Sequence, residues 1–412
     1  MTTNTPPVDL RQWIEQRQKS AKHDLATSSV SPLSVSDLLE ISEDKNKSRE
    51  ALSLDNVTLE DRLRTGDGLR TNLAALYSAR AAGVTADDII LTAGPSAAAF
   101  TLLSSILVAG DHVICQSPAN NSFVQISRSL GVEVTYWKST SANKWRLQAN
   151  DVQSDIKDNT KAIILQSPCD PTGAIVPKPV LEELMDLAAE KGILIIADET
   201  FRPLFHSILP SHEDFSPSTI NFGYKKVAVV GSITKAYSLP GINVGWIASR
   251  DQSIITACKQ KKSFITPSIS KLDETVATEA VSDWCIHALL ARNIRLCQAN
   301  LDLLEAFISE HSWACSWVKP LAGTTALLKF HKMGKPVNGE AFSNALLSQT
   351  GLLVVPAATY HGEAVDLRGY VSVAFGGSTV QFEAALAAWK QFMEESYDTV
   401  PVVAKSSNDQ GQ

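Results

Sequence analysis

Gly231-Ser232-Ile233-Thr234-Lys235-Ala236-Tyr237-Ser238-Leu239-Pro240-Gly241 follows the apolar run 226–230 and ends shortly before Val244-Gly245-Trp246. The apolar run predicts a buried strand, and the glycines and the proline predict a turn after it. Lys235 therefore stands just past a buried strand, with the hydroxyls of Ser232 and Thr234 before it. A lysine held in this way is placed to form an imine with a bound aldehyde. Taken alone, such a stretch is more often an ordinary strand-to-helix turn with a solvated lysine. Whether Lys235 forms an imine must therefore be inferred from the other motifs in the chain.

The composition is that of a globular protein whose ligands are small molecules. The chain has 412 residues, of which 44% are hydrophobic and 20% charged, enough for two or three domains. The formal net charge is -7, so acidic residues outnumber basic ones. Neither nucleic acid nor an acidic membrane surface is therefore expected as a partner. No apolar run reaches the length of a membrane span and residues 1–7 lack a signal-peptide pattern, which predicts a cytoplasmic protein. The six cysteines have no CxxC spacing and no paired histidines, so neither a metal site nor a disulfide framework is expected.

Strand and helix patterns alternate between residues 87 and 230. The expected strands are 87–92, 111–115, 132–137, 161–166, 193–198 and 226–230, and the expected helices between them are 97–108, 123–130 and 179–191. This order predicts a mostly parallel sheet covered by helices on both faces, with ligands beyond the carboxyl ends of the strands. The residues at or just past those ends are Ser96, Asn120, Asp170, Asp198 and Lys235. We expect one crevice to hold all five.

A phosphate cradle is predicted where the strand 87–92 enters Ala93-Gly94-Pro95-Ser96 and a helix begins at once. The free N–H groups and the dipole of a helix N-terminus both favour an anion. Pro95 removes one donor from this cradle.

The remaining segments are expected to flank this sheet. Helices are predicted at 10–19, 35–41, 71–82, 251–263 and 269–309, and the charged segment 43–50 is predicted to be a solvated face. A smaller α+β unit is predicted from strands at 324–330, 352–356 and 370–375 and helices at 339–349 and 380–396. The helix 10–19 is too short to be stable alone and must dock on another surface, for which a partner subunit is one candidate.

Three motifs together resemble the class I/II aminotransferase family of pyridoxal phosphate (PLP) enzymes, fold type I. They are Ser167-Pro168-Cys169-Asp170-Pro171-Thr172-Gly173, Asp198-Glu199-Thr200-Phe201 and Ser232-Ile233-Thr234-Lys235, in this order. The match covers most of the chain from about Leu25 to Glu395. Leu25-Ala26 and the stretch Cys258 to Phe264 look most like the 1-aminocyclopropane-1-carboxylate (ACC) synthase branch.

The resemblance implies a homodimer with an α/β fold. A large domain would hold a mostly parallel seven-stranded sheet sandwiched by helices, beside a small α+β C-terminal domain. The implied divisions are an N-terminal arm with part of the small domain at 1–45, the large domain at 46–290, the small domain at 291–397 and a disordered tail at 398–412.

The same resemblance implies roles for the residues that match. Lys235 would form the imine with PLP and later abstract and return the Cα proton, and Asp198 would pair with the pyridinium nitrogen. Ser232 and Thr234 match hydroxyl positions near the cofactor phosphate, and so does Ser96 beside Gly94. Without the resemblance, the three hydroxyl residues would be read as ordinary turn residues. Asp198 alone would be read as a helix cap or turn residue.

Five positions depart from the family pattern. Asn120 stands where an aromatic side chain stacks on the ring, Asp170 replaces the asparagine that donates to the phenolic oxygen, and Phe201 replaces the tyrosine that reaches it. Asn243 replaces the phosphate-binding arginine, and Ser372 replaces the arginine that grips the substrate α-carboxylate.

The loss at residue 372 is the most informative of these departures. Removing a bidentate guanidinium forfeits about 1.5–3 kcal/mol of binding for a free amino acid. Arg368 is a nearby substitute, but its offset places it at or before the start of the strand. Asp170 can accept but not donate unless protonated, so it either alters the electronics of the cofactor, serves as an acid/base group, or only caps a proline turn.

The sequence thus predicts a PLP enzyme that acts on an amino-acid-derived amine by imine exchange at Lys235 and Cα deprotonation. A specialised biosynthetic lyase or cyclase, for example a carbon–sulfur lyase, is preferred. An aminotransferase with an unusual amino donor and a degenerate member without PLP chemistry are the alternatives. Tyr360 and His361 are candidates for the mouth of the crevice, and His206 is a weaker one, with packing or surface roles favoured for each.

Overall fold

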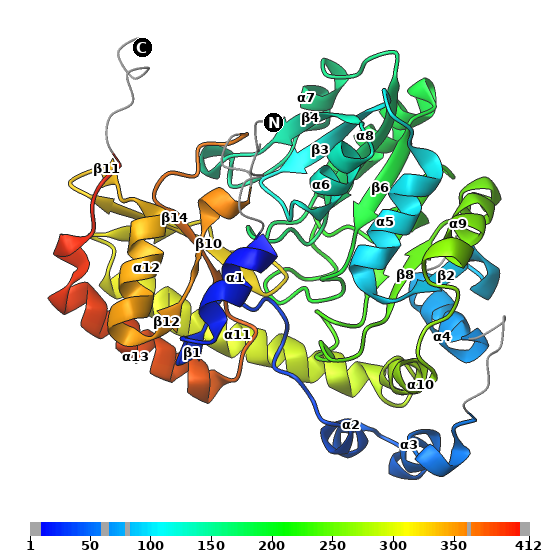
Figure 1. The fold of residues 1–412 in the computed structure, drawn as a ribbon, viewed down its shortest axis with the longest axis horizontal. Coiled ribbons are helices and arrows are strands. Elements are labelled where there is room, and N and C mark those ends of the chain that lie inside the picture. Colours follow the sequence, from blue (N-terminus) through cyan, green and yellow to red (C-terminus); the bar gives the residue numbers. More distant parts are fainter. Residues whose placement is uncertain (1–9, 59–65, 79–82, 361–363, 404–412) are drawn as a thin grey trace, which may run out of the picture.

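The computed structural model describes residues 10–58, 66–78, 83–360 and 364–403, which form a large sheet and a smaller one side by side (Figure 1). The expected end of the helix 71–82 and most of the expected tail lie outside the described residues, as does His361. None of the helices in the described ranges is long and apolar enough to cross a bilayer.

The large sheet has seven strands in the order β2-β8-β7-β6-β5-β3-β4. Their bounds are β2 Ile89–Thr92, β3 His112–Ser117, β4 Glu133–Lys138, β5 Thr160–Gln166, β6 Leu194–Asp198, β7 Val227–Ser232 and β8 Gly245–Ala248. All neighbours pair in parallel except β8, which is antiparallel to both β2 and β7. The predicted fold class is therefore confirmed. The strand β8 was missed, because its four residues follow a turn and give no alternation to detect.

Separate apolar clusters cover the two faces of this sheet, which is why its inner strands read as continuous apolar runs. The helices around it are α4 Asp67–Tyr77, α5 Gly94–Ile106, α6 Ser122–Ser129, α7 Ala149–Gln153, α8 Lys178–Lys191, α9 Gln252–Ile265 and α10 Lys271–Ala280. The helix expected from residue 71 begins at Asp67 instead, after Gly66 in a left-handed conformation.

The smaller sheet is antiparallel, with order β11-β10-β14-β13 and β9 added on β10. Its strands are β9 Cys315–Trp317, β10 Thr325–Lys332, β11 Lys335–Pro336, β13 Val355–Pro356 and β14 Tyr370–Ala374, and α12 Gly339–Thr350 and α13 Thr379–Glu395 accompany it. The single strand predicted at 352–356 is in fact two, β12 Leu352–Leu353 and β13. β12 pairs with the N-terminal strand β1 His23–Asp24 rather than with this sheet.

The predicted helix 269–309 is broken into α10 and α11 Ile286–Glu310. Residues 281–285 contain neither glycine nor proline, so no residue type marks the break. The expected domain boundary at residue 290 falls inside α11.

Three short helices precede the large sheet. α1 Leu10–Gln18 matches the predicted helix, and its buried Trp13 packs on Leu353, Val355 and Tyr360 of the same chain. α2 Val35–Ile41 also has its predicted bounds. The charged residues of the segment 43–50 are mostly exposed, as predicted for a solvated face. The opposite side of α3 Lys45–Ala51 buries Ser48, whose hydroxyl donates to Glu279.

Candidate active site

Lys235 lies in the turn after β7 and is half-buried. Its Nζ donates a hydrogen bond to Ser28 Oγ at 2.7 Å and stands 5.8 Å from the centroid of the Phe201 ring. Burial lowers the pKa of this amine, whereas the charges of Asp170 and Asp198 act in the opposite direction. The amine can therefore give up its proton more readily than a solvated lysine while two carboxylates stand nearby.

Asp198 closes β6 and is 8% exposed. Its Oδ1 accepts from the N–H of Thr200 at 3.0 Å, and its Oδ2 accepts from Gln166 Nε2 at 2.9 Å. Burial raises the pKa of this carboxyl to about 6, against the effect of the two hydrogen bonds. At neutral pH the group is anionic, and a cation placed beside it would be stabilised.

Asp170 is buried in the loop after β5, where residues of the smaller sheet reach it. The hydroxyl of Tyr360 donates to Asp170 Oδ1 at 3.2 Å, and the side chains of Thr325 and Asn120 also hydrogen-bond the carboxyl. Burial raises its pKa, and the charge of Lys235 opposes this. Tyr360 further hydrogen-bonds Ser372 of β14, so Ser372 belongs to the same polar cluster.

The predicted phosphate cradle forms where β2, β8 and α5 meet. Gly94 has φ +84°, and a Cβ there would lie 2.1 Å from Asn243 Oδ1, so only glycine fits this close approach. Ser96 and Asn243 are exposed at this end of α5. The helix therefore begins at an exposed turn, and its role as a phosphate cradle stays a prediction.

The two hydroxyls before Lys235 behave differently. Ser232 is buried and donates to the carbonyl of Val244 at 3.1 Å, and its oxygen lies 2.8 Å from Thr234 Oγ1. Since its one proton is used on Val244, Ser232 braces the turn rather than facing a ligand. Thr234 is half-buried and is the hydroxyl of this pair that can reach outward.

Asn120 and Phe201 both lie by the crevice. The side-chain oxygen of Asn120 accepts from the N–H and the hydroxyl of Ser122, at 3.1 and 2.7 Å. Phe201 is 2% exposed and presents its ring toward the Lys235 ammonium.

Two weaker candidates have other roles. His206 is buried against Phe375, and burial lowers its pKa to about 4, as expected of a packed histidine. Arg368 is exposed and makes a bidentate contact with Asp366, at 2.9 Å from Nε and 2.8 Å from Nη2. Its guanidinium is thus engaged by Asp366.

Sequence reasoning missed Ser28, Gln166 and Thr325. Ser28 lies in an irregular stretch with no local pattern, and only its contact with Lys235, 207 residues away, marks it. Gln166 ends a predicted strand, as Asp198 does, so its position was a usable signal.

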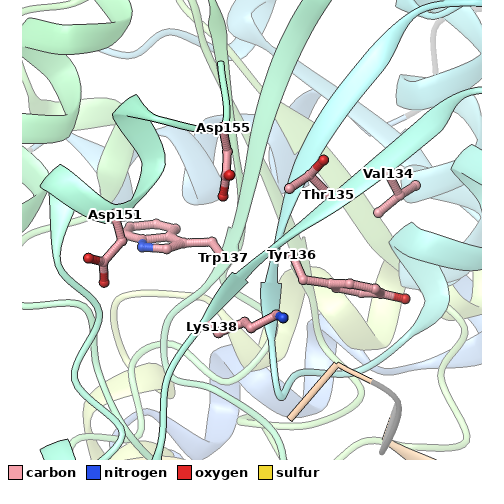
Figure 2. A pocket seen from close by; sticks show the side chains of 7 residues that line it. All are labelled: Val134, Thr135, Tyr136, Trp137, Lys138, Asp151 and Asp155. Atoms are coloured by element: carbon pink, nitrogen blue, oxygen red, sulfur yellow. The ribbon is translucent and has the colours of Figure 1, made fainter. Parts of the chain in front are cut away.

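Two of the cavities formed by the described residues lie along the large sheet. One of about 490 Å³ follows the edge strand β4, where Tyr136 and Trp137 point to opposite sides of the strand (Figure 2). It contains none of the predicted site residues. A smaller one of about 20 Å³ is lined by Gln116, Asn120, Gln166 and Asp198, among others, and belongs to the crevice.

Comparisons with known proteins agree over nearly the whole chain. A family model described as aminotransferase class I and II matches residues 43–388. Capreomycidine synthase of Streptomyces vinaceus is 26% identical over 383 residues, which cover 93% of this chain and 92% of that protein.

Two solved structures are similar in fold. A PLP-dependent aminotransferase from Streptococcus suis has a TM-score of 0.84 and 28% identity, covering 95% of this chain and 98% of its own. The PLP-dependent cyclase OrfR has a TM-score of 0.81 and 24% identity, covering 96% and 99%.

Proposed function

The chain belongs to the class I and II aminotransferase family, and on that premise we propose that it is a specialised biosynthetic lyase or cyclase acting on an amino-acid-derived amine. Its cofactor is pyridoxal 5'-phosphate, as in the enzymes to which it is similar. Lys235 would carry the cofactor, and the substrate would not be held by an arginine clamp at residue 372.

The residues present fit this cofactor. Bound PLP supplies an aldehyde for a lysine amine and a protonated pyridine ring that withdraws electrons from the substrate Cα. The Lys235 amine has its pKa lowered by burial, and the Asp198 carboxylate can pair with a ring cation. Gly94 carries no side chain, so the Asn243 side chain can approach the start of α5, where the helix N-terminus suits a phosphate.

In this proposal Lys235 also moves the proton. Once the substrate amine has displaced it, its Nζ takes the proton from the substrate Cα and later returns it. Ser28 Oγ, at 2.7 Å, orients the released amine. Asp198 remains ionised throughout and holds the proton on the ring nitrogen.

The observation that carries the specialised role is the polar cluster of Asp170, Tyr360 and Ser372. The residue that would grip an α-carboxylate is a buried serine bonded to Tyr360, and Tyr360 donates to a buried carboxyl. An ordinary amino-acid transaminase would not tolerate the loss of its cationic clamp together with a carboxyl group nearby. In this proposal Asp170 is ionised at rest. Because burial raises its pKa, it takes up a proton more readily than a solvated carboxyl and can pass that proton to a leaving group.

The fate of the deprotonated substrate separates the two preferred reactions. Loss of a β or γ substituent gives a lyase, and ring closure, as the resemblance to the ACC synthase branch implies, gives a cyclase. Similarity to capreomycidine synthase over 93% of the chain supports a biosynthetic role. We also propose a homodimer, which the resemblance to the family implies.

An aminotransferase with an unusual amino donor is the second candidate. The aminotransferase from Streptococcus suis, 28% identical over 95% of this chain, favours it. Stoichiometric conversion of the cofactor to pyridoxamine phosphate by one amine would establish this reaction instead. A member without PLP chemistry is disfavoured because Lys235 and Asp198 are both retained, the first half-buried and the second buried.

The test is the visible spectrum of the purified protein before and after borohydride reduction, with mass analysis of the peptide that contains Lys235. We expect a Schiff-base band that reduction abolishes and a reduced cofactor attached to Lys235. Lys235→Ala should show no attachment. A colourless protein that fails to trap added PLP would overturn the proposal, and rapid transamination of a common amino acid with 2-oxoglutarate would overturn the specialised role.

A further inference from the structure

Gln166 is the last residue of β5, and its side chain spans three strand ends of the large sheet. Its Oε1 accepts from the N–H of Asp170 at 2.9 Å and from the N–H of Asn120 at 3.4 Å. Its Nε2 donates to Asp198 Oδ2 at 2.9 Å. The side chain is 4% exposed, so these contacts are made away from bulk water.

The two backbone donors fix the orientation of the amide. A side-chain amide has one acceptor end and one donor end, and N–H groups can bond only the acceptor. Because Asp170 and Asn120 both present N–H groups to one end, the other end that faces Asp198 must be the NH₂. Reversing the amide would break both backbone bonds and point an oxygen at a carboxylate.

The strand pairs beside Gln166 end close to this residue. β3 and β5 pair only as far as Cys115 and Ile164, whereas β5 and β6 pair up to Gln166 and Asp198. The backbone N–H of Gln166 donates to the side-chain Oε1 of Gln116 at 2.8 Å rather than to the backbone of a neighbouring strand. A second glutamine thus holds the backbone of the first where the crevice opens.

From these contacts we propose that Gln166 is a positioning residue: its amide holds Asp198 ionised and aimed at the ring nitrogen of the cofactor, and ties it to the loops carrying Asp170 and Asn120. The inference rests on the proposed function, because it assigns Asp198 to the ring nitrogen. Gln166 itself touches Asp198 and two backbone groups, so it acts through Asp198.

Removing the amide donor of Gln166 should shift the pKa of Asp198 in a predictable direction. The hydrogen bond from Gln166 stabilises the charged carboxylate against its burial, so its loss raises the pKa of Asp198 further. In Gln166→Leu the carboxyl stays protonated to a higher pH and is then a poor partner for a ring cation. PLP affinity at neutral pH should fall about tenfold or more, as for the loss of a buried hydrogen bond to a charged group.

The experiment measures the dissociation constant of PLP and the absorbance of the bound cofactor from pH 5 to pH 9. In Gln166→Leu we expect the acid-side loss of affinity to begin about one pH unit higher than in the wild type. Gln166→Glu keeps the size but places a carboxyl against Asp198. It should resemble the wild type while that carboxyl is protonated and show an additional absorbance transition at higher pH. The exposed Gln153→Glu makes the same charge change on α7 and should match the wild type.

The outcomes separate the two proposals. If the wild type forms no reducible linkage at Lys235, the proposed function fails and takes this inference with it. If the wild type does, but both Gln166 variants bind PLP with the wild-type pH dependence, only the inference is overturned. A lower melting temperature of the variants with an unchanged pH profile also overturns it, because that result describes a merely structural side chain. Should Gln166→Glu fail to fold, the affinity profile of Gln166→Leu decides alone.

Discussion

Ser28 Oγ and Lys235 Nζ are joined by a 2.7 Å hydrogen bond, although the two residues are 207 positions apart. The bond is one of several that hold the segment 25–33 between the sheets. Val30 N–H donates to the carbonyl of Lys235 at 3.3 Å, and the hydroxyl of Thr324 donates to the carbonyl of Ser28. The N-terminal segment thus touches the lysine turn on one side and the smaller sheet on the other.

Ser28→Ala should slow catalysis while leaving the cofactor attached. The released amine of Lys235 loses the oxygen that orients it, so kcat should fall by about tenfold, equivalent to about 1.4 kcal/mol of a hydrogen bond to a charged group. Single-turnover kinetics on the PLP-loaded protein would measure this. Ser31→Ala, in the same segment but bonded through its backbone to Gly376, is the matched control and should behave as the wild type. An unchanged rate in Ser28→Ala would remove Ser28 from the mechanism.

Asp170→Asn should lower the pKa of the Schiff-base nitrogen of the loaded protein by about one unit or more. A negative charge beside that nitrogen favours its protonated form, so removing the charge favours the deprotonated form. An amide N–H also donates to the phenolic oxygen, which acts in the same direction. Absorbance against pH reports the change, and the exposed Asp186→Asn on α8 is the control. A higher pKa in Asp170→Asn would contradict the assignment.

The stability of the apoprotein should depend on pH through two buried groups, whose effects on stability have opposite signs. The pKa of His206 is lowered by burial to about 4, so its contribution is present above pH 6.5 and is lost as the pH falls toward 4. The pKa of Asp198 is raised by burial to about 6, so its contribution is present below the ordinary value of 3.8 and is lost as the pH rises through 6. Each effect is of the order of 3 kcal/mol.

Thermal unfolding of His206→Gln and Asp198→Asn between pH 4 and 7.5 tests both signs. The melting temperature of His206→Gln should fall less on acidification than that of the wild type, because no buried ring must be protonated. The melting temperature of Asp198→Asn should fall more on acidification than that of the wild type, because this variant lacks the carboxyl whose protonation stabilises the folded state. Parallel curves for all three proteins would show that neither residue titrates as described.

Gly231→Ala should destabilise the centre of the large sheet. A Cβ at Gly231 would lie 2.2 Å from the Trp246 ring, which is buried and donates from Nε1 to the hydroxyl of Tyr77 at 2.8 Å. Displacing a packed ring costs about 1–3 kcal/mol, which denaturant unfolding can resolve. Gly223→Ala adds a Cβ with nothing within 4 Å and should be close to neutral.

The large sheet was predictable because burial on both faces leaves a continuous apolar run in each inner strand. β5, β6 and β7 were found within one or two residues of their observed bounds, and with them Asp198 and Lys235 at their ends. The four-residue β8 was not found, because it is too short to show alternation, and the break before α11 was not found, because no glycine or proline marks it.

The surroundings of Lys235 were only partly predictable. Asp170 and Tyr360 were named as candidates, but their hydrogen bond joins residues 190 positions apart and follows from the docking of the two sheets. Ser28 was not named, because a serine in an irregular stretch has no local signal. Contacts of this kind depend on tertiary structure, which periodicity does not encode.

The placement of the segment 25–33 sets an order of events during synthesis. Its partners Thr324, Leu353, Ala374 and Gly376 leave the ribosome some 300 residues after it does. Until they emerge, Leu25 and Ser31 have no backbone partners from the smaller sheet, and Ser28 cannot be fixed from both sides. A nascent chain that already holds all seven strands of the large sheet therefore still has an unfinished lysine site, and its last quarter completes that site by capturing its first residues.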